Sequence, residues 1–355
     1  MKCIQFEQEK EYIRDFLKLP KRLYTKTTNM ENSGEVETFL KGTHPLSKYV
    51  TLHKFLIYRE NEAVGRFVIT VYPQDTTAYL GFFECVEEGE VASFLFAQAC
   101  AYAKKLGFDK IIGPVDVSFW NKYRLKINLF DKLPYTGEPY NLPYYRDLFL
   151  ENGFRVCEHY TSNIYNQVDG EEPLYDERYQ TFTGKGYRIV SPVIEDFDKV
   201  IKELYELITE LYSDFPIYKD VAYEDFAAVF SDYRYILNMD MVRMAYYEEK
   251  AVGFFVSVPD YGNAVYHLNN PLNLLKILSL KKKPKRYVML YMGVDQAHRG
   301  LGKALVGSIM EELRKSGLPS IGALARDGKV TQNYGKEHIE EKYEYVLLEK
   351  DLRGA

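Results

Sequence analysis

The chain has 355 residues, more than one hydrophobic core usually supports, so its length predicts two domains. A composition of 46% hydrophobic and 27% charged residues is globular, and the net charge of −5 disfavours a general nucleic-acid-binding protein, because such proteins are basic. The four cysteines lack CxxC spacing, the six histidines lack HxH or HxxxH spacing, and neither a long apolar run nor a signal-peptide core is present, which predicts a cytoplasmic protein without metal or membrane contact.

The first half of the sequence predicts a mixed α/β domain. Strand-like apolar runs are separated by helical patterns, in which apolar residues recur three or four positions apart. In chain order, the expected elements are a helix at 9–19, a hairpin of strands at 52–58 and 63–71, a strand at 78–86, a helix at 91–107 that ends in a C-cap glycine, a strand from residue 110, a helix at 143–154 and a strand at 155–165.

The second half repeats this order of elements. The segments AVGRFVITV and AVGFFVSV begin 188 residues apart, at Ala63 and Ala251, and each follows a polar turn. The other expected elements are a helix at 195–212, strands at 241–247 and 287–294, a helix at 302–317, a strand at 320–326, a helix at 330–342 and a strand at 343–352. We infer a duplicated α/β fold with mixed sheets, with a first domain at 1–167, a linker at 168–185 and a second domain at 186–355.

Small residues gather at the junction between the strand at 287–294 and the helix that follows. The junction reads Arg299-Gly300-Leu301-Gly302-Lys303-Ala304. Glycines ahead of a helix let its unpaired N–H groups and partial positive charge approach an anion such as a phosphate. A bare GxG is equally typical of an ordinary tight turn, and the spacing is neither that of a Walker A loop nor that of a GxGxxG loop.

The same six residues resemble motif A of the GCN5-related N-acetyltransferases (the GNAT superfamily), whose pattern is Q/R-x-x-G-x-G/A. The resemblance implies that the second domain takes acetyl-CoA or another acyl-CoA as co-substrate, with the backbone of residues 299–304 on the pyrophosphate. It also implies that the strand residues Met292, Gly293 and Val294 lie along the pantetheine arm. An amine would attack the thioester directly, and Tyr334 is the candidate acid that protonates the departing thiolate.

The first half follows the same order of elements but lacks the phosphate loop. Its corresponding junction reads Glu87-Glu88-Gly89-Glu90. Each carboxylate would repel a diphosphate at 4–6 Å by about 1 kcal/mol or more, even when partly screened. We therefore expect this domain not to bind CoA and to act as a scaffold and pocket wall. The whole chain resembles bacterial tandem GNAT proteins whose N-terminal copy is degenerate.

The resulting hypothesis is an acyl-CoA-dependent N-acyltransferase, acetyl being the first acyl group to test, that acts on a small-molecule or peptide amine. Two alternatives stay open: a non-catalytic acyl-CoA sensor or interaction module, and an aminoacyl transferase resembling the Fem proteins. The cationic run at 281–286 fits either a solvated loop or a surface that attracts CoA phosphates. No general base is assigned among Glu84, Asp260, Tyr261 and His267, and a homodimer is left open.

Overall fold

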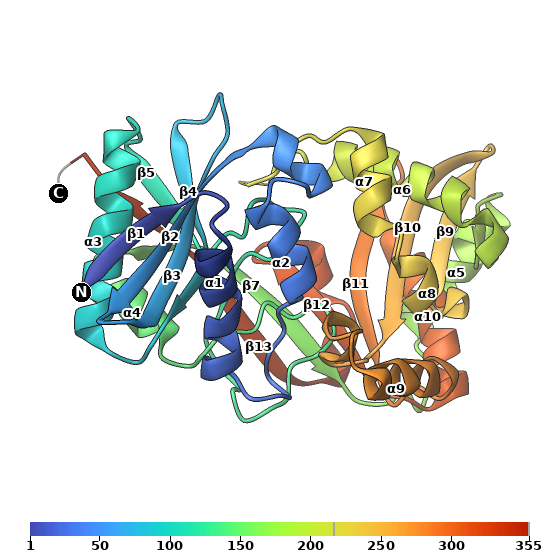
Figure 1. Ribbon diagram of the computed structural model, residues 1–355. Helices are drawn as coiled ribbons and strands as arrows, with labels where there is room; N and C mark the ends of the chain where they lie inside the picture. Colours follow the sequence, from blue (N-terminus) through green and yellow to red (C-terminus); the bar gives the residue numbers. More distant parts are fainter. Residues whose placement is uncertain (216, 354–355) are drawn as a thin grey trace. The chain divides into compact units, whose positions relative to one another are not determined.

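A computed structural model describes residues 1–215 and 217–353 and divides the chain into two compact units. Unit 1 contains residues 1–134 and 138–159 together with those from Glu344 onward, and unit 2 contains residues 135–137 and 160–343. Each unit is a mixed β-sheet with helices packed against it, as the sequence predicts (Figure 1).

The sheet of unit 1 has the strand order β1-β2-β3-β4-β5-β13. Only β4 and β5 are parallel, because helix α3 connects them. The apolar face of α3 forms the core with the sheet, and the rings of Phe83 and Phe96 stack with centroids 5.2 Å apart. The bounds are β1 (Lys2–Phe6), α1 (Lys10–Leu23), α2 (Ser33–Leu40), β2 (Thr51–Arg59), β3 (Glu62–Val71), β4 (Thr77–Cys85), α3 (Gly89–Lys105), β5 (Lys110–Gly113), β6 (Leu125–Lys126) and α4 (Tyr145–Glu151).

The sheet of unit 2 has the strand order β7-β12-β11-β10-β9-β8, with β11 and β12 parallel and α10 between them in the chain. Helix α5 packs on α10 at Gly307, where a Cβ would lie 2.5 Å from the Tyr175 carbonyl oxygen, so glycine is what permits the close approach. The bounds are β7 (Arg155–Tyr165), α5 (Pro173–Gly184), β8 (Arg188–Val190), α6 (Phe197–Tyr212), α7 (Tyr223–Phe230), α8 (Tyr233–Ile236), β9 (Val242–Tyr247), β10 (Lys250–Pro259), α9 (Pro271–Lys282), β11 (Tyr287–Val294), α10 (Leu301–Ser316), β12 (Ser320–Arg326) and β13 (Ile339–Asp351).

The last strand of each half of the sequence contributes to the unit formed by the other half. Residues 160–165 of β7 belong to unit 2, where they pair with β12, and residues 348–351 of β13 belong to unit 1, where they pair with β5. The observed units therefore differ from the expected domains at 1–167 and 186–355. The hydrophobic pattern shows where a strand forms, but it does not show which sheet the strand joins.

Two expected local structures are wrong. The segment 168–185, expected as a linker, contains α5, which packs on α10. The helix expected at 330–342 is replaced by two 3-10 turns, η5 (Val330–Asn333) and η6 (Lys336–His338), and β13 follows at once. Gly335 separates the turns with a φ of +57°, a left-handed conformation that ends helical structure.

Candidate functional site

Strand β11 leaves the edge of its second part open. Its first three residues pair in parallel with β12, whereas residues 291–294 pair only with β10 among the described strands. The register with β10 shifts by one residue at Leu290, a β-bulge, and the later residues of β12 pair with β7 instead. The two parallel strands therefore part, and one side of residues 291–294 is left without a neighbouring strand.

Backbone groups of β11 point into this opening. Asp295 N–H donates to the Val252 carbonyl of β10 at 2.9 Å. Because backbone groups alternate in an antiparallel ladder, those of Gly293 and Tyr291 also face β10. Met292 and Val294 have the opposite parity, and no described residue accepts a hydrogen bond from their N–H groups. The Met292 carbonyl accepts a hydrogen bond from the hydroxyl of Tyr212, at the end of α6, at 2.9 Å. An extended ligand with amide groups could pair with this edge as a strand does.

The loop from β11 to α10 carries a group of unpaired N–H groups. Gly300 has a φ of +94°, in the left-handed region that favours glycine, and it is the N-cap of α10. The N–H groups of Leu301 and Lys303 donate to carbonyls within the loop, whereas those of Arg299, Gly300 and Gly302 form no backbone hydrogen bond with any described residue. We call these last three groups the N–H cradle; they stand at the positive end of the α10 dipole.

Charge at the N–H cradle is positive. Arg299 is exposed and Lys303 is half-buried, and neither forms a salt bridge with a described residue. The side chains of Leu301 and Ala304 are fully buried in the core of unit 2, so these two residues anchor the helix and offer only backbone to a ligand. Two free cations beside unpaired N–H groups make this helix end suited to a phosphate or diphosphate.

Tyr334 lies over the start of α10. A Cβ on Gly302 would come 2.6 Å from the Tyr334 hydroxyl oxygen and 3.2 Å from Met292 Cε, so the structure brings these three predicted residues together. Tyr165 fixes the backbone by donating its hydroxyl hydrogen to the Tyr334 carbonyl at 2.8 Å. Burial raises the pKa of the Tyr334 hydroxyl, and Tyr175 adds to the effect, so the group keeps its proton at neutral pH and can act as an acid.

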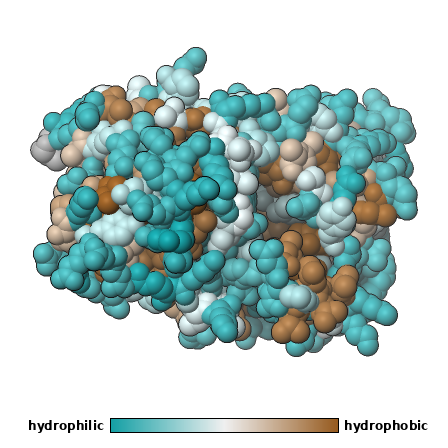
Figure 2. All heavy atoms as spheres, viewed as in Figure 1, coloured by the Kyte–Doolittle hydropathy of each residue, from teal (hydrophilic) through white to brown (hydrophobic). Residues whose placement is uncertain are grey.

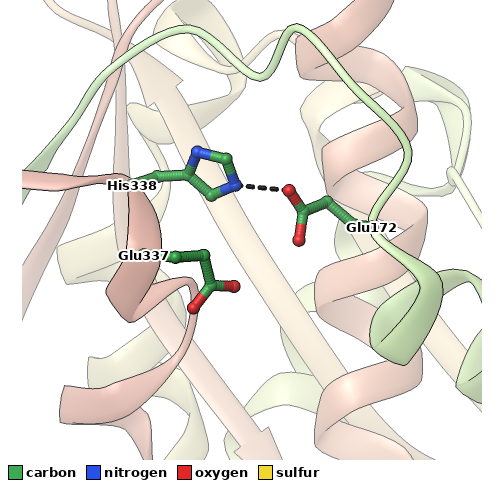
Figure 3. A group of neighbouring side chains, drawn as sticks. All are labelled: Glu172, Glu337 and His338. Carbon is green, nitrogen blue, oxygen red and sulfur yellow. Dashed lines mark hydrogen bonds and ion pairs between the residues drawn. The ribbon is translucent and has the colours of Figure 1, made fainter.

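The turns that carry Tyr334 are fastened to the start of α5. His338 Nε2 is hydrogen-bonded to Glu172 Oε1 (Figure 3), and Gly335 N–H donates to the Tyr175 hydroxyl at 2.7 Å. Glu337 lies beside the pair, and ligand atoms of Glu172, Glu337 and His338 all lie within 4.8 Å of one another, a spacing that could hold a metal ion. Since the Glu172–His338 bond already accounts for their proximity, we interpret the group as a clamp that positions the Tyr334 turn.

The corresponding edge in unit 1 is filled by the chain itself. Strand β4 also parts from β5 after its first three residues. Beyond that point Val115 N–H donates to the Leu80 carbonyl at 2.8 Å, and the Asp116 carboxylate accepts from Phe82 N–H at 2.5 Å. A Cβ on Gly81 would lie 2.0 Å from the Val115 carbonyl oxygen, so no space is left beside the strand. Groups that are open on β11 are thus satisfied internally on β4.

The helix that follows β4 begins with negative charge. Glu87, Glu88 and Glu90 are exposed around the start of α3, and only Glu88 is neutralised by a salt bridge, with Arg59 at 2.5 Å, among the described residues. Carboxylates beside a helix N-terminus take the place that an anionic ligand would need. The filled edge and these carboxylates both support the prediction that unit 1 does not bind CoA.

Glu84, considered as a general base, is a buried residue of unit 1. The Tyr145 hydroxyl donates to its carboxylate at 2.5 Å, and the Arg66 guanidinium, which also binds Glu31, lies 3.7 Å away. Burial raises the pKa of Glu84 to about 7, although the charge of Arg66 opposes this shift. The surroundings make it a member of an internal charge network.

The loop after β10 also has structural contacts. Asp260 forms a salt bridge with Arg286 and accepts a hydrogen bond from Thr136 N–H at 2.9 Å. Tyr261 is fully buried and donates its hydroxyl hydrogen to the Ile236 carbonyl at 2.7 Å. Both side chains therefore hold the loop in position, and neither is assigned as a general base.

No family model matches the chain. The sequence is 20% identical over 272 residues to Protein YghO of Escherichia coli (strain K12), covering 74% of this chain and 70% of that protein. A solved tandem GNAT protein from the clavulanic acid biosynthesis pathway is similar over 100% of this chain and 99% of its own, with a TM-score of 0.56 and 12% identity. The chain has a tandem GNAT fold.

A second solved structure supports the tandem GNAT fold. It contains a GCN5-related glucosamine N-acetyltransferase region within a fungal multi-domain GH3 β-N-acetylglucosaminidase. The similarity covers 98% of this chain and 38% of that chain, with a TM-score of 0.57 and 12% identity. At such identity the comparisons show a shared fold, and the predicted duplicated architecture is thereby confirmed.

Within the tandem GNAT fold, the predicted site residues have different orientations. Met292, Val294 and the N–H cradle face the open edge, whereas the N–H and carbonyl of Gly293 face β10 by ladder parity. Glycine is nevertheless required at 293, because a Cβ would lie 2.6 Å from the Phe254 ring. Sequence reasoning missed Tyr212, since nothing in the pattern of α6 marks its contact with the Met292 carbonyl.

Proposed function

We propose that the protein is an acyl-CoA-dependent N-acyltransferase, with acetyl-CoA the first donor to test and a small-molecule or peptide amine as acceptor. The observation that carries the proposal is the open edge of β11, which runs directly into the N–H cradle. A pantetheine arm has amides that can pair with a strand edge, and it leads to a pyrophosphate that suits a helix N-terminus. Unit 2 offers both features in that order along the chain.

Unit 2 can supply a hydrogen-bond or proton donor for the steps of the transfer. The N–H of Met292 or Val294 would donate to the thioester oxygen and stabilise the negative charge that develops there. A neutral amine would attack the carbonyl carbon, so that the C–N bond forms, the C–S bond breaks and the amine proton passes to solvent. Tyr334 would give its proton to the thiolate and regain one from water. Binding both substrates side by side supplies most of the remaining acceleration.

The structure favours this proposal over its alternatives through the site in unit 2. A non-catalytic sensor would need the same CoA site but not a protonated Tyr334 at the helix start. An aminoacyl-tRNA-dependent transferase has no need of a diphosphate site, and the chain is acidic overall. Turnover distinguishes the first alternative, because a sensor would bind acetyl-CoA and release no free thiol in the presence of any amine.

The test is calorimetric titration of acetyl-CoA into wild-type protein and two matched variants. Gly302→Glu places a carboxylate in the N–H cradle, where Tyr334 and Met292 leave no room. Gly89→Glu makes the same change at the corresponding helix start of unit 1, where a Cβ would meet nothing within 4 Å. We expect one site per chain, lost in Gly302→Glu and retained in Gly89→Glu. Absence of binding by the wild type overturns the proposal; binding followed by thiol release across an amine panel supports it.

A further inference from the structure

Helix α9 carries an apolar face that no other described part of unit 2 covers. Ile277 is its one buried residue, and with Tyr261 and Ala264 it forms a small separate core. Figure 2 shows hydrophobic side chains gathered at the lower right, over the place that α9 has in Figure 1. The exposed fractions reach 71% for Leu272, 63% for Leu275 and 65% for Leu278. We call the exposed leucines the leucine patch; they are Leu268, Leu272, Leu274, Leu275 and Leu278.

The leucine patch covers one side of α9 and is exposed to solvent. At 100° per residue, the four leucines within α9 span an arc of roughly 160°, opposite the side that packs on unit 2 through Ile277. The helix has 12 residues, so it is about 18 Å long, much less than the roughly 30 Å of a bilayer core. No helix among the described residues is long and apolar enough to cross a membrane. Such a helix would therefore lie along a surface.

The charge around the leucine patch has a single sign. Residues 261–294 contain six Lys and Arg residues and no Asp or Glu, although the chain as a whole has a net charge of −5. Two of these cations are used internally: Lys281 donates to the Tyr235 carbonyl at 2.8 Å, and Arg286 binds Asp260. The other four are exposed and form no salt bridge with any described residue; they are Lys276, Lys282, Lys283 and Lys285.

From this geometry we infer that α9 binds the surface of an anionic phospholipid membrane, with the leucine patch in the interface and the four lysines at the headgroups. Exposed leucines are stabilised when they leave water, and the lysine side chains beside them can extend to phosphates while their stems stay in apolar surroundings. The sequence predicts a protein without membrane contact only because spanning segments and leader sequences are lacking. Neither bears on a helix that lies flat on a membrane surface.

A second copy of the chain fits this surface less well. A two-fold symmetric contact places each patch against itself. Lys276, Lys282 and Lys283 would then face the same lysines of the partner, with no acidic residue on α9 or in the run that follows it to balance them. Like charges brought together in an interface oppose association, whereas anionic headgroups complement them.

The experiment is co-sedimentation of the full chain with vesicles of phosphatidylcholine containing 30% phosphatidylglycerol, compared with phosphatidylcholine alone. We expect binding to the anionic vesicles that weakens as salt is raised. Lys282→Gln and Lys283→Gln should each weaken it about fivefold, and the double variant Leu275→Gln/Leu278→Gln by at least tenfold. The matched controls are Leu133→Gln, at an equally exposed leucine of unit 1, and Lys18→Gln; both should bind as the wild type does.

Two results would overturn the inference. One is failure of the wild type to bind the anionic vesicles at low salt; if the wild type is then a dimer in light scattering that the leucine double variant converts to monomer, the patch belongs to a second copy. The other is equal vesicle binding by the wild type and the leucine double variant. Far-ultraviolet circular dichroism of each variant checks that the fold is retained.

Discussion

Replacing Glu84 by Gln should remove a pH-dependent loss of stability from unit 1. The carboxyl is buried, and its pKa is about 7 in the folded protein against 4.5 for an ordinary glutamate. Below pH 4.5 the group is protonated in both states and has no effect. Between pH 4.5 and 7 the unfolded chain gives up this proton more readily than the native protein, so rising pH favours unfolding.

The size of the effect follows from that difference. Each unit of pKa corresponds to 1.36 kcal/mol, so a folded value near 7 lowers the free energy of unfolding by about 2 to 3 kcal/mol between pH 5 and pH 8. Gln cannot ionise, yet its side-chain oxygen can still accept the hydrogen bond from Tyr145, and Arg66 keeps Glu31 as a partner. The variant should therefore lose this part of the pH dependence and retain the fold.

The single tryptophan makes the measurement specific to unit 1. Trp120 lies in this unit, so its fluorescence during urea unfolding reports this unit rather than unit 2. The quantity to compare is the change in unfolding free energy from pH 5 to pH 8 in the wild type, in Glu84→Gln and in Glu90→Gln, an exposed carboxylate of the same unit. Equal changes in all three proteins would refute the reasoning, because they would mean that burial does not raise the pKa of Glu84 in the folded protein.

Three further predictions concern the site and the core. Tyr334→Phe should lower kcat about 100-fold with little change in KM, measured as thiol release at saturating acetyl-CoA, since it removes a proton donor. Lys126→Met should destabilise unit 1 by about 3 to 5 kcal/mol in urea unfolding, because it leaves Glu138, 2.9 Å away in a fully buried pair, without its cation. Glu172→Gln should weaken the contact with His338 and speed hydrogen exchange over residues 330–338, and unchanged exchange would argue against the clamp.

The strands were the most predictable part of the fold. The runs expected at 155–165, 287–294 and 320–326 have the same bounds as β7, β11 and β12 in the structure, because segments rich in apolar, aromatic and β-branched residues are a local signal. The helix expected at 330–342 was wrong for a reason that is not local. Gly335 turns the chain there, and contacts with Tyr165 and Tyr175, distant in sequence, hold the turn in place.

The candidate site was predictable where it is built from one segment and not where it is built from several. The motif at 299–304 indicated the N–H cradle, since a helix start needs only adjacent residues. The open edge of β11 depends on where β12 stops pairing, which no pattern of single residues reveals. Likewise the acidic junction after β4 suggested a degenerate copy, but the filling of its edge by Val115 and Asp116 became visible only in the structure.

The exchange of final strands has a consequence for biosynthesis. A ribosome makes the rest of unit 1 and all of unit 2 before it begins the segment from Glu344 that completes the sheet of unit 1. Until that segment emerges, β5 has an unpaired edge, and exposed edges invite pairing with other chains. Unit 2, whose residues end at Tyr343, can complete its own sheet first. The half that is made first is thus the half that finishes folding last. Dividing the chain near residue 168 would also yield two fragments, each of which lacks one strand of its own sheet.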